Sequence, residues 1–469
     1  PSGYYGRYRL SYLMPAVLWP DPVVLVVPEA LRQRLLLVEI PRLQQWMSVP
    51  KPIQMGDRWP SADYQGLLLT SVESWLEDRL NLGDRFPDHI PTIIDGVENL
   101  EAQVREALTL DFHPQSWNQL MLACPQHAET IRNTRVQLTH SIFQHPQSPY
   151  DCYLIDADEH EMLLSLGHLL TSSAPDSKGS NGNGAAHSSF PTAEWSSFLA
   201  QTQRPGQLIW TTVNRDQGVF SLHCCPFDVT SALAPVWHRQ PVVLIGGSLD
   251  LESDAPVFRQ RLGLEDLTCL KFSPDPHREL IQVYVPDRIP MPNTPQFQPA
   301  LIQHLREMIG AQSDTHGLTV ILIGDVPLKA QVASQLASEY GSRVQVEKTC
   351  LDENGILVSG WEFWQMHQAV LPTPNLLAIA TLPIPSLEHP LVAGRVSQYK
   401  RLHQNWFRLY LLPETLNTLQ QAIAPMRESQ GVVALLDNRV NHRSYGSQVL
   451  SAISPHARIS YLDSTVFKA

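Results

Sequence analysis

Near its start the chain carries a glycine-containing stretch that could bind a phosphate group. Residues 3–8 read Gly-Tyr-Tyr-Gly-Arg-Tyr and lead into an apolar segment. Backbone N–H groups of a glycine-rich turn at a helix start bind phosphate, and a nearby cation strengthens such a site. Arg7 could supply the cation, but arginine does not replace lysine in a tight phosphate cradle, and Tyr8 is too bulky to copy a small hydroxyl ligand. Two interpretations stay open: a residual anion site formed by Gly3, Gly6, Arg7 and Tyr8, or a strand-to-helix turn with a surface arginine.

A second candidate site is the acidic run that follows a predicted strand at residues 153–155. The run reads Asp156-Ala157-Asp158-Glu159. Two carboxylates at a strand end can serve phosphate-ester hydrolysis, since one binds Mg²⁺ and the other orients the attacking water. We predict Asp156 as the metal ligand and Asp156, Asp158 and Glu159 as catalytic acids. The equally weighted alternative is an acidic helix start, which the helix dipole favours without any metal.

Charge and cysteine content narrow the class of protein. The chain has 34 basic and 46 acidic residues and a formal net charge of -12, so any nucleic-acid site must be a local groove rather than a general cationic surface. Its six cysteines contain no CxxC pair, which suits free thiols in a reducing cytoplasm. No apolar run approaches the roughly 20 residues that span a bilayer, so we expect a cytoplasmic protein without a membrane segment.

The elements that would position these residues alternate between strands and helices. Short Val/Ile/Leu runs at residues 21–28, 241–249, 318–324 and 431–437 are each typical of a buried parallel strand, and the first, third and fourth lead into stretches with helical spacing. This alternation predicts an α/β fold with two parallel-sheet domains. A length of 469 residues also favours more than one domain. A proline-rich stretch at 273–299 indicates a linker, so we place the boundary near residue 275, between a domain at 1–275 and a domain at 276–469.

Two segments interrupt the first predicted domain. Apolar residues at helical spacing between residues 64 and 123 predict a helical insertion, which we place at about 64–135. Residues 172–189 carry no apolar side chain larger than alanine, which predicts a disordered loop because nothing there could offset the entropy of ordering.

Several motifs in chain order resemble those of DinG/XPD-like superfamily-two ATP-dependent DNA helicases. The most specific is GVVALLDNRVNHRSYGSQVLSAISP at 431–455, and Trp361-Glu362-Phe363-Trp364 is similar to another segment of the family. VQLTHSIFQ at 136–144 and YDCYLIDADEHEM at 150–162 resemble the Asn-His-Ala-Leu segment and the DEAH box. The opening stretch, residues 3–18, resembles the phosphate-loop helix. The resemblance implies two RecA-like helicase domains, ATP with Mg²⁺ as cofactors, and single-stranded DNA as a partner.

At several positions where the family has functional residues, this sequence has other residue types. Gly246-Gly247-Ser248 stands at the Ser-Ala-Thr position, and Pro425 stands near the first arginine of the family's last motif, leaving Arg427 as the candidate catalytic arginine finger. Such a finger is typically worth about 10³ or more in rate. The family's iron–sulfur cluster needs four cysteines before the DEAH strand, but only Cys124 precedes Cys152, so no iron–sulfur cluster is expected.

We therefore expect a helicase-family protein that acts on or binds single-stranded nucleic acid, with ATPase activity weak or lost. The alternative is a catalytically inactive helicase-like scaffold, or a module that binds single strands or an unidentified protein. A basic and aromatic cluster could stack on bases and contact their phosphates, or could be the charged face of an amphipathic helix. Its members are Arg395, Tyr399, Lys400, Arg401, Trp406, Phe407, Arg408 and Tyr410.

Overall fold

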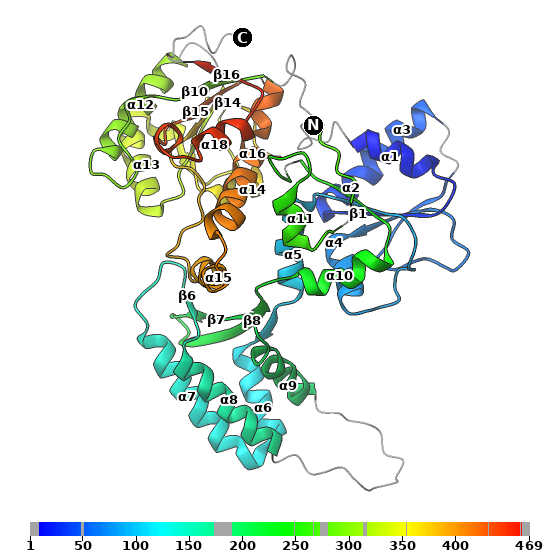
Figure 1. The fold of residues 1–469 in the computed structure, drawn as a ribbon. Coiled ribbons are helices and arrows are strands. Elements are labelled where there is room, and N and C mark those ends of the chain that lie inside the picture. The colour runs from blue at the N-terminus through cyan, green and yellow to red at the C-terminus, as the bar shows by residue number, and fades with distance from the viewer. Residues whose placement is uncertain are drawn as a thin grey trace.

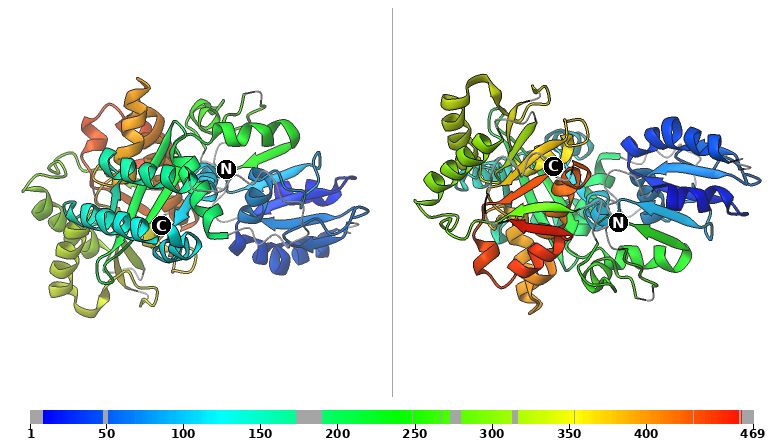
Figure 2. Two further views of the ribbon diagram at one scale, coloured as in Figure 1. Left: turned by 90° about the horizontal axis from the view of Figure 1, so that it is seen from below. Right: turned by 90° about the horizontal axis from the view of Figure 1, so that it is seen from above.

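The computed structural model describes residues 9–47, 51–172, 190–247, 249–265, 267–272, 280–312, 317–352, 354–429, 431–459 and 461. These residues form three lobes, each built on one sheet (Figure 1). We call them the first lobe (residues 9–107 and 228–265), the insertion lobe (residues 110–226) and the second lobe (residues 280–459). Figure 2 shows the first and second lobes side by side, each with helices on both faces of its sheet.

The first lobe has a five-stranded parallel sheet in the order β2-β3-β1-β4-β9. The strands are β1 (Val23–Val27), β2 (Ile53–Met55), β3 (Leu67–Ser71), β4 (Thr92–Asp95) and β9 (Val242–Ile245). Every residue of β1, β3 and β4 is buried, as expected for a parallel sheet covered on both faces. One face packs against α1 (Arg9–Leu18), α2 (Glu29–Arg34), η2 (Leu35–Glu39) and α3 (Ile40–Trp46). The other packs against α4 (Val72–Leu80), η3 (Val97–Asn99), α5 (Leu100–Ala107), α10 (Thr230–Arg239) and α11 (Pro256–Leu262).

The insertion lobe has an antiparallel sheet in the order β5-β8-β7-β6. Its strands are β5 (Leu110–Phe112), β6 (Cys152–Leu154), β7 (Gln207–Asn214) and β8 (Val219–Pro226). Its helices are α6 (Pro114–Ala123), η4 (Pro125–His127), α7 (Ala128–Gln144), α8 (Ala157–Ser172) and α9 (Phe190–Thr202). Phe112, Trp117 and Trp195 pack edge to face at the centre of this lobe, so it has an aromatic core of its own.

The second lobe has a seven-stranded parallel sheet in the order β12-β13-β11-β14-β15-β10-β16. The strands are β10 (Ile281–Tyr284), β11 (Leu318–Leu322), β12 (Val344–Val346), β13 (Ile356–Ser359), β14 (Pro374–Ile379), β15 (Val432–Leu435) and β16 (His456–Ile459). On one face lie α12 (Phe297–Ala311) and α13 (Val326–Tyr340). On the other lie α14 (Trp361–His367), α16 (Leu412–Ser429) and α18 (Gly446–Ala452). The remaining elements are η5 (Gly341–Arg343), α15 (Pro390–Arg401), η6 (Phe407–Leu411) and α17 (Arg439–His442).

The predicted fold class, α/β with two RecA-like parallel-sheet domains, is confirmed by these two sheets. The insertion differs from the prediction of helices at about 64–135, because β3 and β4 lie in that segment and belong to the first sheet. Both strands are short and adjoin amphipathic helices, whose periodicity dominates the local pattern. The separate lobe instead spans residues 110–226, and four strands organise it.

Two further predictions fall largely outside the described residues. The boundary near residue 275 lies within 273–279, and the loop predicted at 172–189 lies outside the described chain from residue 173 onward. Strands of the first sheet come from residues 23–245 and those of the second from residues 281–459. Within the described chain, no helix is both long and apolar enough to cross a membrane.

Candidate functional site

The carboxyl ends of the first-lobe strands bring together an acid and a tyrosine. In open α/β sheets ligands bind at this edge, where side chains leave the ends of the parallel strands. Asp95 is the last residue of β4 and is only 2% exposed. Its Oδ2 accepts a hydrogen bond of 2.9 Å from the hydroxyl of Tyr12, which lies on α1. The strand order thus places the start of the chain beside an acid more than 80 residues away.

A second acid, Glu98, lies one turn beyond Asp95 and packs against the end of β9. Gly96 connects the two with a φ of 81°, a left-handed conformation that favours glycine. The Glu98 carboxylate accepts a hydrogen bond from the backbone N–H of Gly247, and its Oε2 is buried without a hydrogen-bond partner among the described residues. A Cβ on Gly246 would lie 2.8 Å from that Oε2, so the carboxylate packs directly against the backbone of this glycine.

Burial sets the charge of Glu98. Removal of its carboxyl group from water raises the pKa to about 7, the nearby negative charge of Asp95 acts in the same direction, and two backbone N–H groups oppose the shift. Near neutral pH, Glu98 is therefore partly protonated. The end of β4 therefore carries less negative charge than two fully ionised carboxylates would, because Glu98 is partly protonated.

The second lobe faces this strand end with neutral side chains of α14 and α16. Asn417 donates from Nδ2 to the backbone carbonyl oxygen of Glu98 over 3.4 Å. Gln421 donates to the Asn417 Oδ1 over 3.1 Å, and Gln365 donates to the Gln421 Oε1 over 3.2 Å. A chain of uncharged amides therefore lies where the two parallel-sheet lobes meet.

Comparison with known proteins gives this meeting point of the two parallel-sheet lobes a family context. Residues 360–456 match the family described as the Helicase C-terminal domain. The ATP-dependent DNA helicase YoaA of Escherichia coli (strain K12) is 24% identical over 276 residues, which cover 55% of this chain and 43% of YoaA. The 3'-5' exonuclease DinG of Bacillus subtilis (strain 168) is 24% identical over 289 residues, which cover 56% of this chain and 31% of that protein. The chain is related to the DinG/XPD-like helicases of superfamily two.

The shared fold extends over almost the whole of this helicase-like chain. The structure of S. tokodaii Xpd4 superposes with a TM-score of 0.58 at 12% identity, over 97% of this chain and 94% of that one. A structure described as XPD helicase gives a TM-score of 0.53 at 11% identity. The predicted resemblance is confirmed, while the helicase-like chain spans less than half the length of the curated relatives that it matches.

The acids predicted as the DEAH box of this helicase-like chain lie in the insertion lobe, away from the end of β4. Asp156, Asp158 and Glu159 follow β6 in the antiparallel sheet of the insertion lobe, not a strand of a parallel sheet. The prediction failed because a short apolar run ending in acid looks the same in either kind of sheet. Asp158 is exposed and lines a shallow cleft of about 400 Å³ between α7 and α8.

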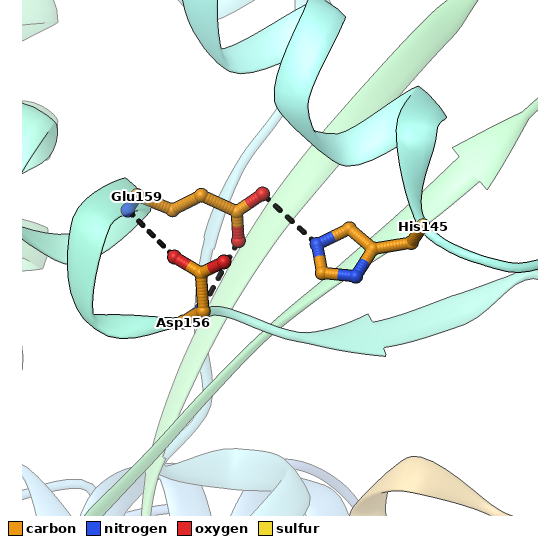
Figure 3. Close-up of side chains that lie close together, drawn as sticks. All are labelled: His145, Asp156 and Glu159. Carbon is orange, nitrogen blue, oxygen red and sulfur yellow. Dashed lines mark hydrogen bonds and ion pairs between the residues drawn. The ribbon is translucent and has the colours of Figure 1, made fainter.

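Asp156 and Glu159 form a reciprocal cap at the start of α8 (Figure 3). The Glu159 N–H donates to Asp156 Oδ1 over 2.8 Å, and the Asp156 N–H donates to Glu159 Oε2 over 3.1 Å. Glu159 is fully buried, and its Oε1 lies 3.0 Å from His145 Nε2 and 2.9 Å from the Ser141 hydroxyl that donates to it. His145, Asp156 and Glu159 have the spacing to surround a metal ion. The two bonds between Asp156 and Glu159 are those of a capping box, which agrees with the alternative of an acidic helix start, and His145 adds a separate contact to Glu159.

The candidate arginine finger of this helicase-like chain is part of the second-lobe core. Arg427 is 7% exposed, and its Nη2 donates to the carbonyl oxygens of Ile453 and Ser454 over 2.9 and 3.0 Å. It lies ten residues along α16 from Asn417, which corresponds to about 15 Å of helix. The prediction that Arg427 borders the cleft is therefore wrong. The remaining predicted residues, Gly3, Gly6, Arg7 and Tyr8, lie outside the described chain.

Sequence reasoning missed Asp95 and Glu98, although a signal was present. Thr92-Ile93-Ile94-Asp95 is a short β-branched run that ends in acid and is followed by glycine, the pattern of a strand end. In this helicase-like chain Asp95 has the position that a DEAH aspartate would need, at the carboxyl end of a parallel strand. Gly96 then stands in place of the DEAH glutamate.

The predicted basic and aromatic cluster divides into two parts. Tyr399 and Tyr410 are buried, and the mostly buried Arg395 pairs with Glu101 of the first lobe. Lys400, Arg401 and Arg408 are exposed. The Lys400 ammonium lies 5.6 Å from the ring centroid of the partly exposed Trp406, within range of a cation–π contact. Only the second part is accessible to a ligand.

Proposed function

We propose that this helicase-like chain binds single-stranded nucleic acid through its second lobe, with ATP hydrolysis weak or lost. The observation that carries the second half of this proposal is the incomplete acidic pair at the end of β4. Asp95 could hold Mg²⁺, but Gly96 has no side chain with which to orient a water molecule for attack on a phosphate. The remaining acid, Glu98, is packed against Gly246 and Gly247.

The side chains that the second lobe presents to the end of β4 support the same proposal. Hydrolysis of ATP builds negative charge on the transferring phosphoryl group, and an arginine finger that stabilises it is worth about 10³-fold or more in rate. Asn417, Gln421 and Gln365 are neutral and already bonded to one another or to Glu98. Pro425 stands near the family's first arginine, and Arg427 bonds to carbonyl groups of its own lobe.

The exposed part of the basic cluster supports nucleic-acid binding. Single strands bind where lysine and arginine contact the backbone and an aromatic ring stacks on a base. Lys400 lies over the Trp406 ring, and the exposed Arg401 and Arg408 are close to them in the chain, at the end of α15 and in η6. This local positive charge contrasts with the formal net charge of -12 for the chain. A YoaA-like helicase ancestry makes single-stranded DNA the first ligand to test.

The hydrolysis half of the proposal is tested by phosphate release from ATP and Mg²⁺, with and without an oligo-dT strand. The matched control is Asp95→Asn, which keeps the size of the side chain and its bond to Tyr12 but removes the metal-binding charge. We expect the wild-type rate to equal that of Asp95→Asn. Mg²⁺-dependent turnover that rises with the strand and disappears in Asp95→Asn would overturn this half.

The binding half is tested by fluorescence anisotropy of a labelled oligo-dT strand. The triple variant Lys400→Glu, Arg401→Glu, Arg408→Glu should bind at least about tenfold more weakly, and the slope of log K against log salt should fall by about 2, as expected for three lost phosphate contacts. The control, Arg58→Glu, Arg132→Glu, Arg204→Glu, makes the same change of charge at scattered exposed positions. Equal losses in both triples would refute a local binding site.

A further inference from the structure

Five charged side chains meet where the three lobes join. We call them the junction cluster: Glu101 and Arg105 on α5, Arg261 on α11, Arg395 on α15 and Glu414 on α16. The first three belong to the first lobe and the last two to the second lobe. In Figure 1 these helices converge above β7 and β8 of the insertion lobe.

Glu101 is the centre of the junction cluster. Its Oε1 accepts from Arg105 of its own helix and, over 2.7 Å, from Arg395 of the second lobe. Its Oε2 accepts from Arg261, which also pairs with Glu414 of the second lobe. The Glu101 and Arg395 side chains are 10% and 12% exposed. Two ion-paired links therefore join the two parallel-sheet lobes: the poorly solvated pair of Glu101 with Arg395, and the more exposed pair of Arg261 with Glu414.

The insertion lobe is tied to the same point. Arg105 donates to the carbonyl oxygen of Phe227, just after β8, over 3.1 Å, and the Phe227 ring packs edge to face on Tyr399 of α15 with centroids 5.0 Å apart. The Arg395 guanidinium lies 3.8 Å from the ring centroid of Tyr410. Gly394, the residue before Arg395, lets α15 approach the sheet of the insertion lobe closely, because a Cβ at this position would lie 3.1 Å from Leu208. A movement of α15 would thus break contacts with both other lobes.

Glu101 and Arg395 keep their charges over a wide range of pH. Burial alone would raise the pKa of Glu101, but the charges of Arg261, Arg395 and Arg105 outweigh it and lower the pKa to about 2. Burial lowers the pKa of Arg395, but the combined attraction of Glu101, Tyr410 and Glu414 outweighs it, so the pKa is raised. A sliding of the lobes that moved one partner away while the other stayed out of water would leave a poorly solvated charge unpaired, which is a large penalty.

We propose that the junction cluster is a fixed lock that holds the three lobes in one arrangement whether or not a nucleotide or a nucleic-acid strand is bound. A motor of this fold needs its two parallel-sheet lobes to move relative to each other in each cycle. The lock prevents that movement and keeps α15, with Lys400 and Arg401 at its end, seated on the insertion lobe. This inference goes beyond the proposed function and does not depend on strand binding.

The test measures the distance between the first and second lobes by double electron–electron resonance. One spin label is placed on the exposed Cys350 and the other on Arg58→Cys, after Cys124→Ser and Cys269→Ser remove the two partly exposed thiols. We expect one narrow distance distribution that is unchanged by Mg²⁺ with a non-hydrolysable ATP analogue, by oligo-dT, or by 1 M salt, which screens exposed charges but reaches buried pairs poorly. A shift of the main distance with any of these additions overturns the lock.

Substitutions test whether the junction cluster is the cause of the narrow distance distribution. Glu101→Gln removes the central charge, and Glu414→Gln removes only the more exposed outer partner, whose side chain is 33% exposed. Both should broaden the distribution, Glu101→Gln more strongly, while Glu339→Gln, which breaks the exposed Arg306–Glu339 pair within the second lobe, should leave it narrow. Far-ultraviolet circular dichroism confirms that each variant folds. A distribution that stays narrow in both folded variants refutes the proposal, whatever the strand affinity proves to be.

Discussion

The buried Glu98 allows one prediction to be worked out in energy. Its pKa rises from the ordinary 4.5 to about 7 in the folded chain. Because each pKa unit is worth about 1.36 kcal/mol, ionised Glu98 destabilises the folded state by at most about 3 kcal/mol. The folded chain binds this proton more tightly than the unfolded chain, so the stability falls as pH rises between about 4.5 and 7 and stays low above pH 7.

Glu98→Gln removes this dependence on pH. The amide is neutral at every pH and its oxygen can still accept from the Gly247 N–H. We expect the variant to be more stable than the wild type by up to about 3 kcal/mol at pH 8.5 and by less than about 1 kcal/mol at pH 5. The measurement is the difference in urea unfolding between the two proteins across this range of pH.

The control for this measurement is Glu77→Gln. Glu77 is exposed and pairs with Arg85, which lowers its pKa, so its replacement should give no gain of stability at high pH. A Glu98→Gln difference that is the same at pH 5 and pH 8.5, or a variant less stable than the wild type at pH 8.5, would show that Glu98 is not a buried carboxyl group.

Three further substitutions test the roles assigned to other residues. Asp156→Ala removes one half of the cap of α8 and should lower the free energy of unfolding by about 1–2 kcal/mol, measured by thermal melting. Nucleotide turnover should not change. Altered turnover at an unchanged melting temperature would restore the catalytic interpretation of Asp156. Arg427→Met removes the donor to the carbonyl oxygens of Ile453 and Ser454 and should lower the free energy of unfolding by about 1–3 kcal/mol, again measured by melting. An unchanged stability would argue against a structural role for Arg427. Gly394→Val should lower the melting temperature by more than Gly394→Ala, because the valine side chain meets Leu208 and Leu154. The expected loss of stability for the valine variant is about 1–3 kcal/mol. Equal melting temperatures of the two variants would contradict that close contact.

Sequence by itself determined the fold class and the family resemblance. Continuous apolar runs such as Leu318–Leu322 and Val432–Leu435 predict buried parallel strands, because a strand covered on both faces has no solvent-facing positions to vary. Residues 431–455, which carry the most specific resemblance, lie entirely within the segment 360–456 that matches the Helicase C-terminal domain. These features are local, so a single sequence contains them completely.

Only the tertiary structure decided which strand end forms the site. Asp95 and Asp156 both follow short apolar runs, and only the pairing of β4 within the parallel sheet separates a ligand-binding edge from the helix cap of an antiparallel lobe. Likewise, Arg395 and Lys400 are five residues apart on α15, yet one is paired with Glu101, almost 300 residues away, and the other is exposed. Burial and partners of charged side chains depend on contacts between distant segments, and periodicity along one helix does not encode them.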